Sequence, residues 1–136
     1  MPDLGSTQLT MLWLSIILGI VHVAIAATGS VAKRGLPWAA GPRDDPPAPP
    51  SKVGGRLERA SQNFLETFPF FAVAVLVEMA SNGNPGLAGI GAMTYFWARV
   101  AYLPIYALGL PFIRTLVWTV SVVGIGIVLA ACIPGV

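Results

Sequence analysis

The stretch RLERASQNFLETFPFFAVAVLVEMA, residues 56–80, begins with charged and amide side chains and continues into an apolar run. A helix turns by about 100° per residue, so Arg59, Asn63 and Glu66 lie within roughly 40° of one another and form one stripe. An ionisable group at membrane depth costs on the order of 2.5–3.5 kcal/mol, so it normally faces protein, water or a ligand. The stretch therefore predicts a membrane helix with a polar stripe near its start. Two interpretations of the stripe stay open: a functional site, or a buried polar cluster that holds the helices of the bundle together.

The rest of the chain has the same apolar character. It has 136 residues, of which 55% are hydrophobic and only 10% are charged, and this balance excludes an ordinary soluble domain. The apolar runs are near the roughly 20 residues that a membrane helix needs, and they lack the alternation of a membrane β-barrel. We predict an all-α integral membrane four-helix bundle, as one domain over residues 1–136. Its expected helices cover residues 8–32, 56–81, 86–108 and 111–133.

The long loop over residues 35–55 contains six prolines and the acidic pair Asp44 and Asp45. Because proline breaks helices, we expect an extended cover with no helix in it. Lysine and arginine residues gather in and beside this loop, whereas the loop over residues 81–86 has none. The positive-inside rule then puts the long loop in the cytoplasm and both termini on the other side. Basic residues follow the first apolar run and none precedes it, which indicates a retained helix and not a cleaved signal peptide.

A second polar stripe lies in the third expected helix. Tyr95, Arg99, Tyr102 and Tyr106 are spaced four, three and four residues apart, so they share a face within roughly 60°. Tyr106 and Arg59 both lie near the cytoplasmic ends of their helices, so the two stripes can line one pocket. We interpret Tyr95 as a packing residue or a residue of the aromatic belt at the membrane interface, and not as a ligand contact. For Arg99, two interpretations stay open: a contact with ligand, or a pair with a carboxylate inside the bundle.

The start of the last expected helix carries a cation. Pro111 suits the first helical position, which puts Arg114 and Thr115 in the first turn or so. A cation there opposes the helix dipole, so Arg114 is poorly placed for helix stability alone. Together with the exposed N–H groups, it would make a strong anion site.

Four other polar residues receive structural interpretations. His22 is expected to hydrogen-bond between helices and not to bind metal, because no second histidine or suitably spaced cysteine accompanies it. Arg56 and Glu58 are interpreted as surface charges, and Glu78 as a residue that reaches water at the opposite interface. The net charge of +2 and the lack of a basic and aromatic array argue against nucleic-acid binding.

These motifs resemble the signature of the MAPEG family, the membrane-associated proteins of eicosanoid and glutathione metabolism. In that signature an arginine is followed by alanine, then by asparagine at plus four, glutamate at plus seven and proline about ten on, as in Arg59, Asn63, Glu66 and Pro69. The resemblance continues through ARVAYLPIY, residues 98–106, and PFIRT, residues 111–115. The short loops and compact length look like the bacterial branch of the family.

The resemblance implies a homotrimer in the bacterial inner membrane that binds glutathione as cosubstrate between neighbouring subunits. One subunit would supply the first stripe and the next subunit the tyrosines. The implied activity is that of a glutathione transferase or peroxidase, in which an arginine-stabilised thiolate attacks lipophilic electrophiles that enter from the membrane lipid. The implied glutathione-binding residues are Arg59, Asn63, Glu66, Arg99, Tyr102 and Tyr106, and the implied catalytic residues are Arg114 and Thr115.

A second hypothesis is a non-catalytic MAPEG-like trimer that binds a lipid or a partner protein. The presence of both stripes and Arg114 argues against it, because a scaffold needs no thiolate site. Ser61 and Thr67 stand where the leukotriene-forming branch has glutamine and tyrosine, and the stretch from Tyr106 to Arg114 is one residue longer. An eicosanoid substrate is therefore not implied.

Overall fold

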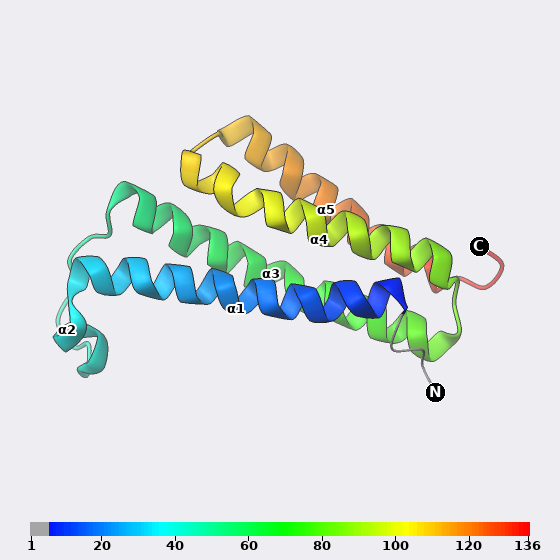
Figure 1. The fold of residues 1–136 in the computed structure, drawn as a ribbon, viewed down its shortest axis with the longest axis horizontal. Helices are drawn as coiled ribbons and strands as arrows, with labels where there is room; N and C mark the ends of the chain where they lie inside the picture. Colours follow the sequence, from blue (N-terminus) through cyan, green and yellow to red (C-terminus); the bar gives the residue numbers. More distant parts are fainter. Residues whose placement is uncertain (1–5) are drawn as a thin grey trace.

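The computed structural model describes residues 6–136, which form four long helices and one short one. The helices are α1 (Thr7–Arg34), α2 (Leu36–Ala40), α3 (Lys52–Ser81), α4 (Pro85–Leu108) and α5 (Pro111–Ala131). In Figure 1, α1 runs along α3, and α4 and α5 form a second antiparallel pair. The α1–α3 loop and the α4–α5 turn lie at one end of the bundle, here called the loop end, whereas α1 begins and α5 stops at the terminal end.

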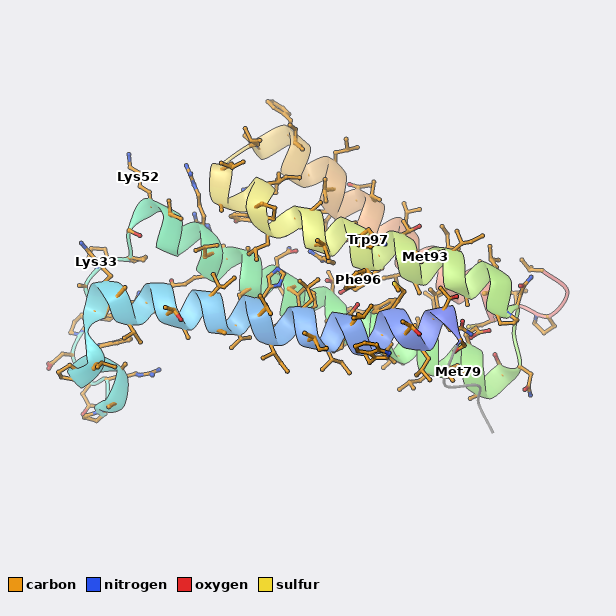
Figure 2. The ribbon with its side chains drawn as sticks, in the orientation of Figure 1. Lys33, Lys52, Met79, Met93, Phe96 and Trp97 are labelled. Atoms are coloured by element: carbon orange, nitrogen blue, oxygen red, sulfur yellow. The ribbon has the colours of Figure 1, made fainter. Side chains whose placement is uncertain are left out.

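The composition of the helices matches a membrane environment. The helices α1, α3 and α5 are long and apolar enough to cross a membrane. With 24 residues α4 is also long enough, but its arginine and three tyrosines lower its hydropathy. These four side chains are buried because α4 contacts α1, α3 and α5, whereas Met93 and Trp97 are exposed and point outward (Figure 2). The prediction of an all-α membrane protein is confirmed.

Two side-chain caps fix where α3 and α4 begin. The Ser51 hydroxyl accepts a hydrogen bond from the Gly54 amide at 3.0 Å, and the Asn84 side-chain oxygen accepts one from the Leu87 amide at 3.1 Å. Serine and asparagine are favoured at this position because they satisfy amides that the first turn leaves free. Capping at Ser51 starts α3 at Lys52, four residues before the expected start at residue 56.

The prediction that residues 35–55 contain no helix was wrong. Besides the first turn of α3, the loop contains α2, which has Pro37 at its start. A proline in the first turn of a helix lacks only an N–H that would have no partner, so there it favours the helix. The Trp38 ring of α2 contacts two guanidinium groups, with the Arg34 and Arg43 carbons 4.9 and 5.0 Å from its centroid. These cation–π contacts tie α2 to the end of α1.

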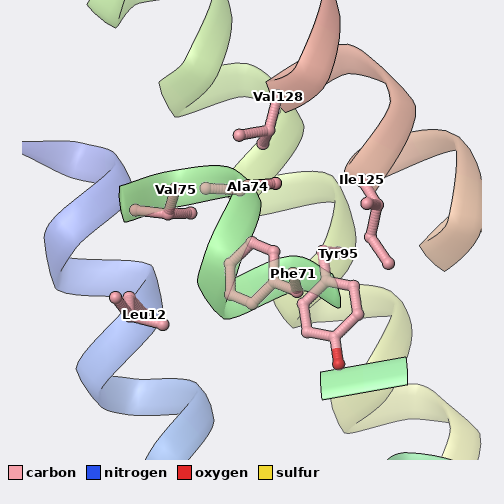
Figure 3. Close-up of a cluster of buried hydrophobic side chains, with 8 residues drawn as sticks. Leu12, Phe71, Ala74, Val75, Tyr95, Ile125 and Val128 are labelled. Atoms are coloured by element: carbon pink, nitrogen blue, oxygen red, sulfur yellow. The ribbon is translucent and has the colours of Figure 1, made fainter. Parts of the chain in front are cut away.

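Apolar side chains from all four long helices meet toward the terminal end. Leu12 of α1, Phe71 of α3, Tyr95 of α4 and Val128 of α5 belong to this cluster (Figure 3). The Phe71 and Tyr95 rings stack with centroids 4.0 Å apart, so the packing interpretation of Tyr95 is confirmed. Because lipid is as apolar as these side chains, close van der Waals packing is what favours the cluster.

The closest approach of α4 and α5 gives a test of the fold. A Cβ added at Gly124 would lie 2.7 Å from the Tyr95 nitrogen and 2.8 Å from the Gly91 oxygen, so the helices would have to separate. We expect Gly124→Val to lower stability by about 1–3 kcal/mol, the usual effect of overpacking. Gly126→Val is the matched control, because no atom lies within 4 Å of its added Cβ. Thermal unfolding in detergent measures both, and equal midpoints would contradict the close packing.

The surroundings of two buried polar residues, His22 and Glu78, differ from the predictions made for them. His22 donates from Nδ1 to the Leu18 carbonyl of its own helix at 3.0 Å and stacks on the Phe64 ring, so the predicted interhelical hydrogen bond was wrong. Glu78 is only 2% exposed and accepts a hydrogen bond from the Gln8 amide at 3.3 Å. The Glu78 carboxylate is held against α1. The expectation that it reaches water at the interface was therefore wrong.

Charged residues hold the loop end together. Arg56 donates to the Ala107 carbonyl near the end of α4 at 3.1 Å, and Glu58 pairs with Arg34 at 3.5 Å. A cation at the last carbonyls of a helix is favourable, because those groups lack partners and carry partial negative charge. Arg56 and Glu58 therefore connect helices and are not simple surface charges, which corrects the expectation.

Candidate functional site

A polar pocket of about 390 Å³ lies at the loop end between α3, α4 and α5. Its volume lies within the usual range for small-molecule sites, roughly 300–1,000 Å³. Its lining comprises Arg59, Gln62, Asn63 and Glu66 of α3, Tyr102 and Tyr106 of α4, and Arg114, Thr115 and Trp118 of α5.

Helical spacing explains why these side chains meet. On α3 the lining residues recur every three or four positions from Arg59 to Glu66, and on α4 the two tyrosines are four positions apart. The Arg59 Nε donates to the Tyr106 hydroxyl at 3.3 Å, which joins the two stripes directly. The Tyr102 and Tyr106 rings meet edge to face with centroids 5.4 Å apart, so the α4 side of the pocket is a fixed aromatic wall.

The first turn of α5 places a second arginine opposite α3. Pro111 opens this helix, and the Arg114 guanidinium carbon lies 4.7 Å from the Tyr106 ring centroid. This cation–π contact aims the guanidinium at the pocket. The Thr115 hydroxyl lines the same pocket and donates to the Pro111 carbonyl at 3.1 Å, so its proton is engaged within the helix. Only its oxygen lone pairs are free toward the pocket.

Arg99 is the one expected site residue that does not line the pocket. Its side chain is 0% exposed and lies behind the pocket wall. Its Nη1 donates to the Asn63 Oδ1 at 2.8 Å, and its Nη2 donates to the Thr67 hydroxyl. No carboxylate of residues 6–136 lies within ion-pair distance of it. The structure therefore supports neither a direct ligand contact nor a pair with a carboxylate for this residue.

Two residues of the pocket were missed at the level of sequence, Gln62 and Trp118. Gln62 follows Arg59 by three positions, and Trp118 follows Arg114 by four. Both therefore lie on the face of their helix that carries the expected arginine. The same spacing that predicted the stripes would have found them.

The two stripes meet within a single chain. The resemblance had implied that the tyrosines contacting the first stripe would come from a neighbouring subunit. In the structure Tyr106 reaches Arg59 of the same chain, and Tyr102 lines the same pocket. A neighbouring subunit is therefore not needed to join the two stripes.

The charges in the pocket are available to a ligand. Two arginines, Arg59 and Arg114, and one carboxylate, Glu66, line it, whereas the ion pair found among residues 6–136 joins Arg34 and Glu58 elsewhere. A ligand with more negative than positive groups would complement this set. No group of His, Cys, Asp or Glu residues in the described part of the chain is suited to a metal ion.

Comparison with known proteins agrees with the architecture. The model of the MAPEG family matches residues 6–133, which is nearly the whole chain. No curated protein matches the sequence. The match includes every residue of the pocket and every long helix.

Proposed function

The chain belongs to the MAPEG family, and from that membership we propose that it is a membrane-bound glutathione transferase with glutathione peroxidase as a side activity. The observation that carries the proposal is the pocket itself, in which two arginines, one carboxylate and two tyrosines converge near the start of α5. A protein that only held lipid would not need this set of charges. The proposed substrates are lipophilic electrophiles.

Glutathione fits the chemistry of the pocket. At neutral pH it carries two carboxylates and one ammonium group, and the pocket offers two guanidinium groups and one carboxylate. Arg59 would pair with a carboxylate of the peptide, Arg114 would face the sulfur that ionises, and Glu66 would accept from the ammonium. The Asn63 amide and the hydroxyls of Tyr102 and Tyr106 would hydrogen-bond to the peptide.

The proposed chemistry depends on the ionised sulfur. A thiol of this kind has a pKa of about 8.5, so a fixed cation beside it increases the thiolate fraction at neutral pH. Arg114 is the proposed cation, with Thr115 next to it. The thiol proton would leave to solvent, the sulfur would form a bond to the electrophilic carbon, and the leaving group would depart with its electron pair.

The helix that carries Arg114 also presents apolar side chains that suit contact with lipid. Phe112 and Leu116 are on α5, on either side of Arg114 in sequence, and their side chains are 89% and 63% exposed. Large exposed apolar side chains are normal where a protein faces lipid tails. Two positions along a helix correspond to about 200° of rotation, so both side chains lie on the face of α5 away from the pocket, and they indicate that this face meets lipid.

We also propose that the protein is a homotrimer in the bacterial inner membrane, with its loop end in the cytoplasm. The sidedness rests on Lys33, Arg34, Arg43, Lys52 and Arg56, which are all at the loop end, where Lys33 and Lys52 project outward (Figure 2). Light scattering of the detergent-solubilised protein should give a protein mass near three times 14.3 kDa.

Binding and turnover test the proposed function separately. Calorimetry of the purified protein in detergent should detect binding of glutathione. Conjugation of chlorodinitrobenzene and reduction of cumene hydroperoxide should then depend on the protein. Binding without either reaction would favour the non-catalytic lipid-binding or partner-binding trimer, and absence of binding would overturn the assignment to glutathione.

A further inference from the structure

Behind the pocket wall lies a buried arginine whose charge has no carboxylate partner within residues 6–136. The Arg99 guanidinium is held by neutral groups: the Asn63 amide oxygen, the Thr67 hydroxyl and the faces of two tyrosine rings. Its carbon lies 5.0 Å from the centroid of Tyr102 and 5.7 Å from that of Tyr95. Burying a charge without an opposite charge beside it costs free energy, so the Arg99 guanidinium should have a function that helix packing alone does not explain.

The contact with Asn63 restricts what that residue can offer to a ligand. A guanidinium group has five N–H donors and no acceptor. Only the oxygen of an amide can face it, so the Asn63 Oδ1 is directed to Arg99 at 2.8 Å. Asn63 also lines the pocket, and its NH₂ group is the part left to face it. An unconstrained asparagine could present either its oxygen or its nitrogen.

We propose that Arg99 is a positioning residue that holds the Asn63 amide with its NH₂ group toward the pocket, so that this point of the pocket accepts only a hydrogen-bond acceptor of the ligand, a carboxylate or carbonyl oxygen. The proposal deepens the proposed function, on which its ligand-binding arm rests. It changes the role expected for Arg99 from ligand contact to selection of the group that binds next to it.

The same guanidinium group also limits movement of the wall. Arg99 is on α4, and its two hydrogen-bond partners, Asn63 and Thr67, are one turn apart on α3. The guanidinium group therefore bridges the two helices. The Thr67 hydroxyl in turn lies 3.4 Å from the Tyr95 hydroxyl, at the edge of the apolar cluster. Arg99 therefore connects the packed core to Asn63 and to the ring of Tyr102.

A double-mutant cycle separates positioning from a direct or purely structural role. Arg99→Met should weaken glutathione binding about tenfold in the parent, the scale of one charged hydrogen bond. In the Asn63→Ala background the same change should have less than about a twofold effect, because the group that Arg99 orients is already absent. Equal losses in both backgrounds would overturn the proposal.

Asn63→Asp keeps the test decisive if Arg99→Met does not fold. The new carboxylate gives the buried guanidinium a counter-charge, so we expect a higher melting temperature than that of the parent. It also removes the NH₂ donor, so glutathione binding should weaken about tenfold or more. Opposite changes in stability and binding are the signature of the proposed role, since a merely structural asparagine would not give them.

Gln62→Glu is the matched control for added charge. Gln62 is exposed and lines the same pocket, whereas the hydrogen bonds of Arg99 go to Asn63 and Thr67. This change should not raise the melting temperature, and it should weaken binding less than Asn63→Asp does. An Asn63→Asp protein that melts no higher than the parent, or that binds glutathione equally well, would overturn the proposal. If the parent binds no glutathione, the proposed function fails, while the melting temperatures still test the contact between Arg99 and Asn63.

Discussion

Replacing Arg114 by alanine is expected to lower the conjugation rate about 100-fold, the effect typical of losing one electrostatic stabiliser at a reacting centre. Glutathione binding should weaken much less, because the guanidinium favours the ionised sulfur over the neutral thiol. The pocket residues of α3 and α4 are unchanged in this variant, so most contacts with the peptide should persist. The prediction therefore separates chemistry from affinity.

The direction of the pH effect follows from the same argument. Removing the cation raises the pKa of the bound thiol, so a smaller fraction is thiolate at neutral pH. The rate of Arg114→Ala should then recover as pH rises, and its pH–rate profile should be displaced to higher pH relative to that of the parent. Ultraviolet absorbance of the thiolate, measured across pH in the protein–glutathione mixture, reports the shift directly.

Arg114→Lys is the control for charge alone. Lysine restores a cation but not the planar fork of donors, nor the stacking of a guanidinium group on the Tyr106 ring. We expect it to recover only part of the rate. If Arg114→Ala titrates and turns over like the parent, Arg114 is not the activating group, and Tyr102, Tyr106 or the amides at the start of α5 take that role.

Helical periodicity explains why much of the pocket could be predicted from sequence. The positions of Arg59, Asn63 and Glu66 on one face depend only on the geometry of a regular helix. Their predicted position near one surface of the membrane followed from the apolar run that begins directly after them. The apolar length of each run is also a local property, and it gave the membrane character of the chain.

Residues whose role depends on neighbouring helices could not be assigned in that way. Arg99 belongs to the same stripe as Tyr102, yet α4 is covered by three helices, and which of them meets each residue is a tertiary property. Glu78 was expected at the interface because nothing local indicates that Gln8 of α1 covers it. The stripe showed which residues share a face but not how that face divides between pocket and core.

The short helix α2 shows a different limit. Composition alone treats each of the six prolines of the loop as a helix breaker, but the effect of a proline depends on its position within the turn. Pro37 stands at the start of a helix, and the Trp38 ring makes cation–π contacts with Arg34 and Arg43. The number of prolines in the loop predicts neither the position of Pro37 in the first turn nor the contacts of Trp38.

Arg59→Ala and Glu66→Gln are each expected to weaken glutathione binding about 10- to 100-fold. A hydrogen bond to a charged group contributes roughly 1.5–3 kcal/mol, and about 1.4 kcal/mol corresponds to a factor of ten in affinity. Both side chains are exposed in the single chain, so we expect Glu66→Gln to change stability by less than about 0.5 kcal/mol. Arg59→Ala also removes the hydrogen bond to Tyr106, so its loss of stability should be about 0.5–1.5 kcal/mol. Lys52→Ala and Glu58→Gln remove the same charges from α3 outside the pocket and should leave binding unchanged.

Ligand analogues make this last prediction specific to the proposed pairing. If Glu66 accepts from the glutathione ammonium, the parent should bind glutathione more tightly than its des-amino analogue, and Glu66→Gln should bind the two almost equally. Arg59→Ala should keep the preference for the ammonium, because its missing partner is an anionic group of the peptide. Calorimetry of the three proteins with the two ligands completes the comparison. Glu66→Gln retaining the full preference would move the ammonium away from Glu66, and unchanged affinity in both variants would make the α3 stripe a structural feature.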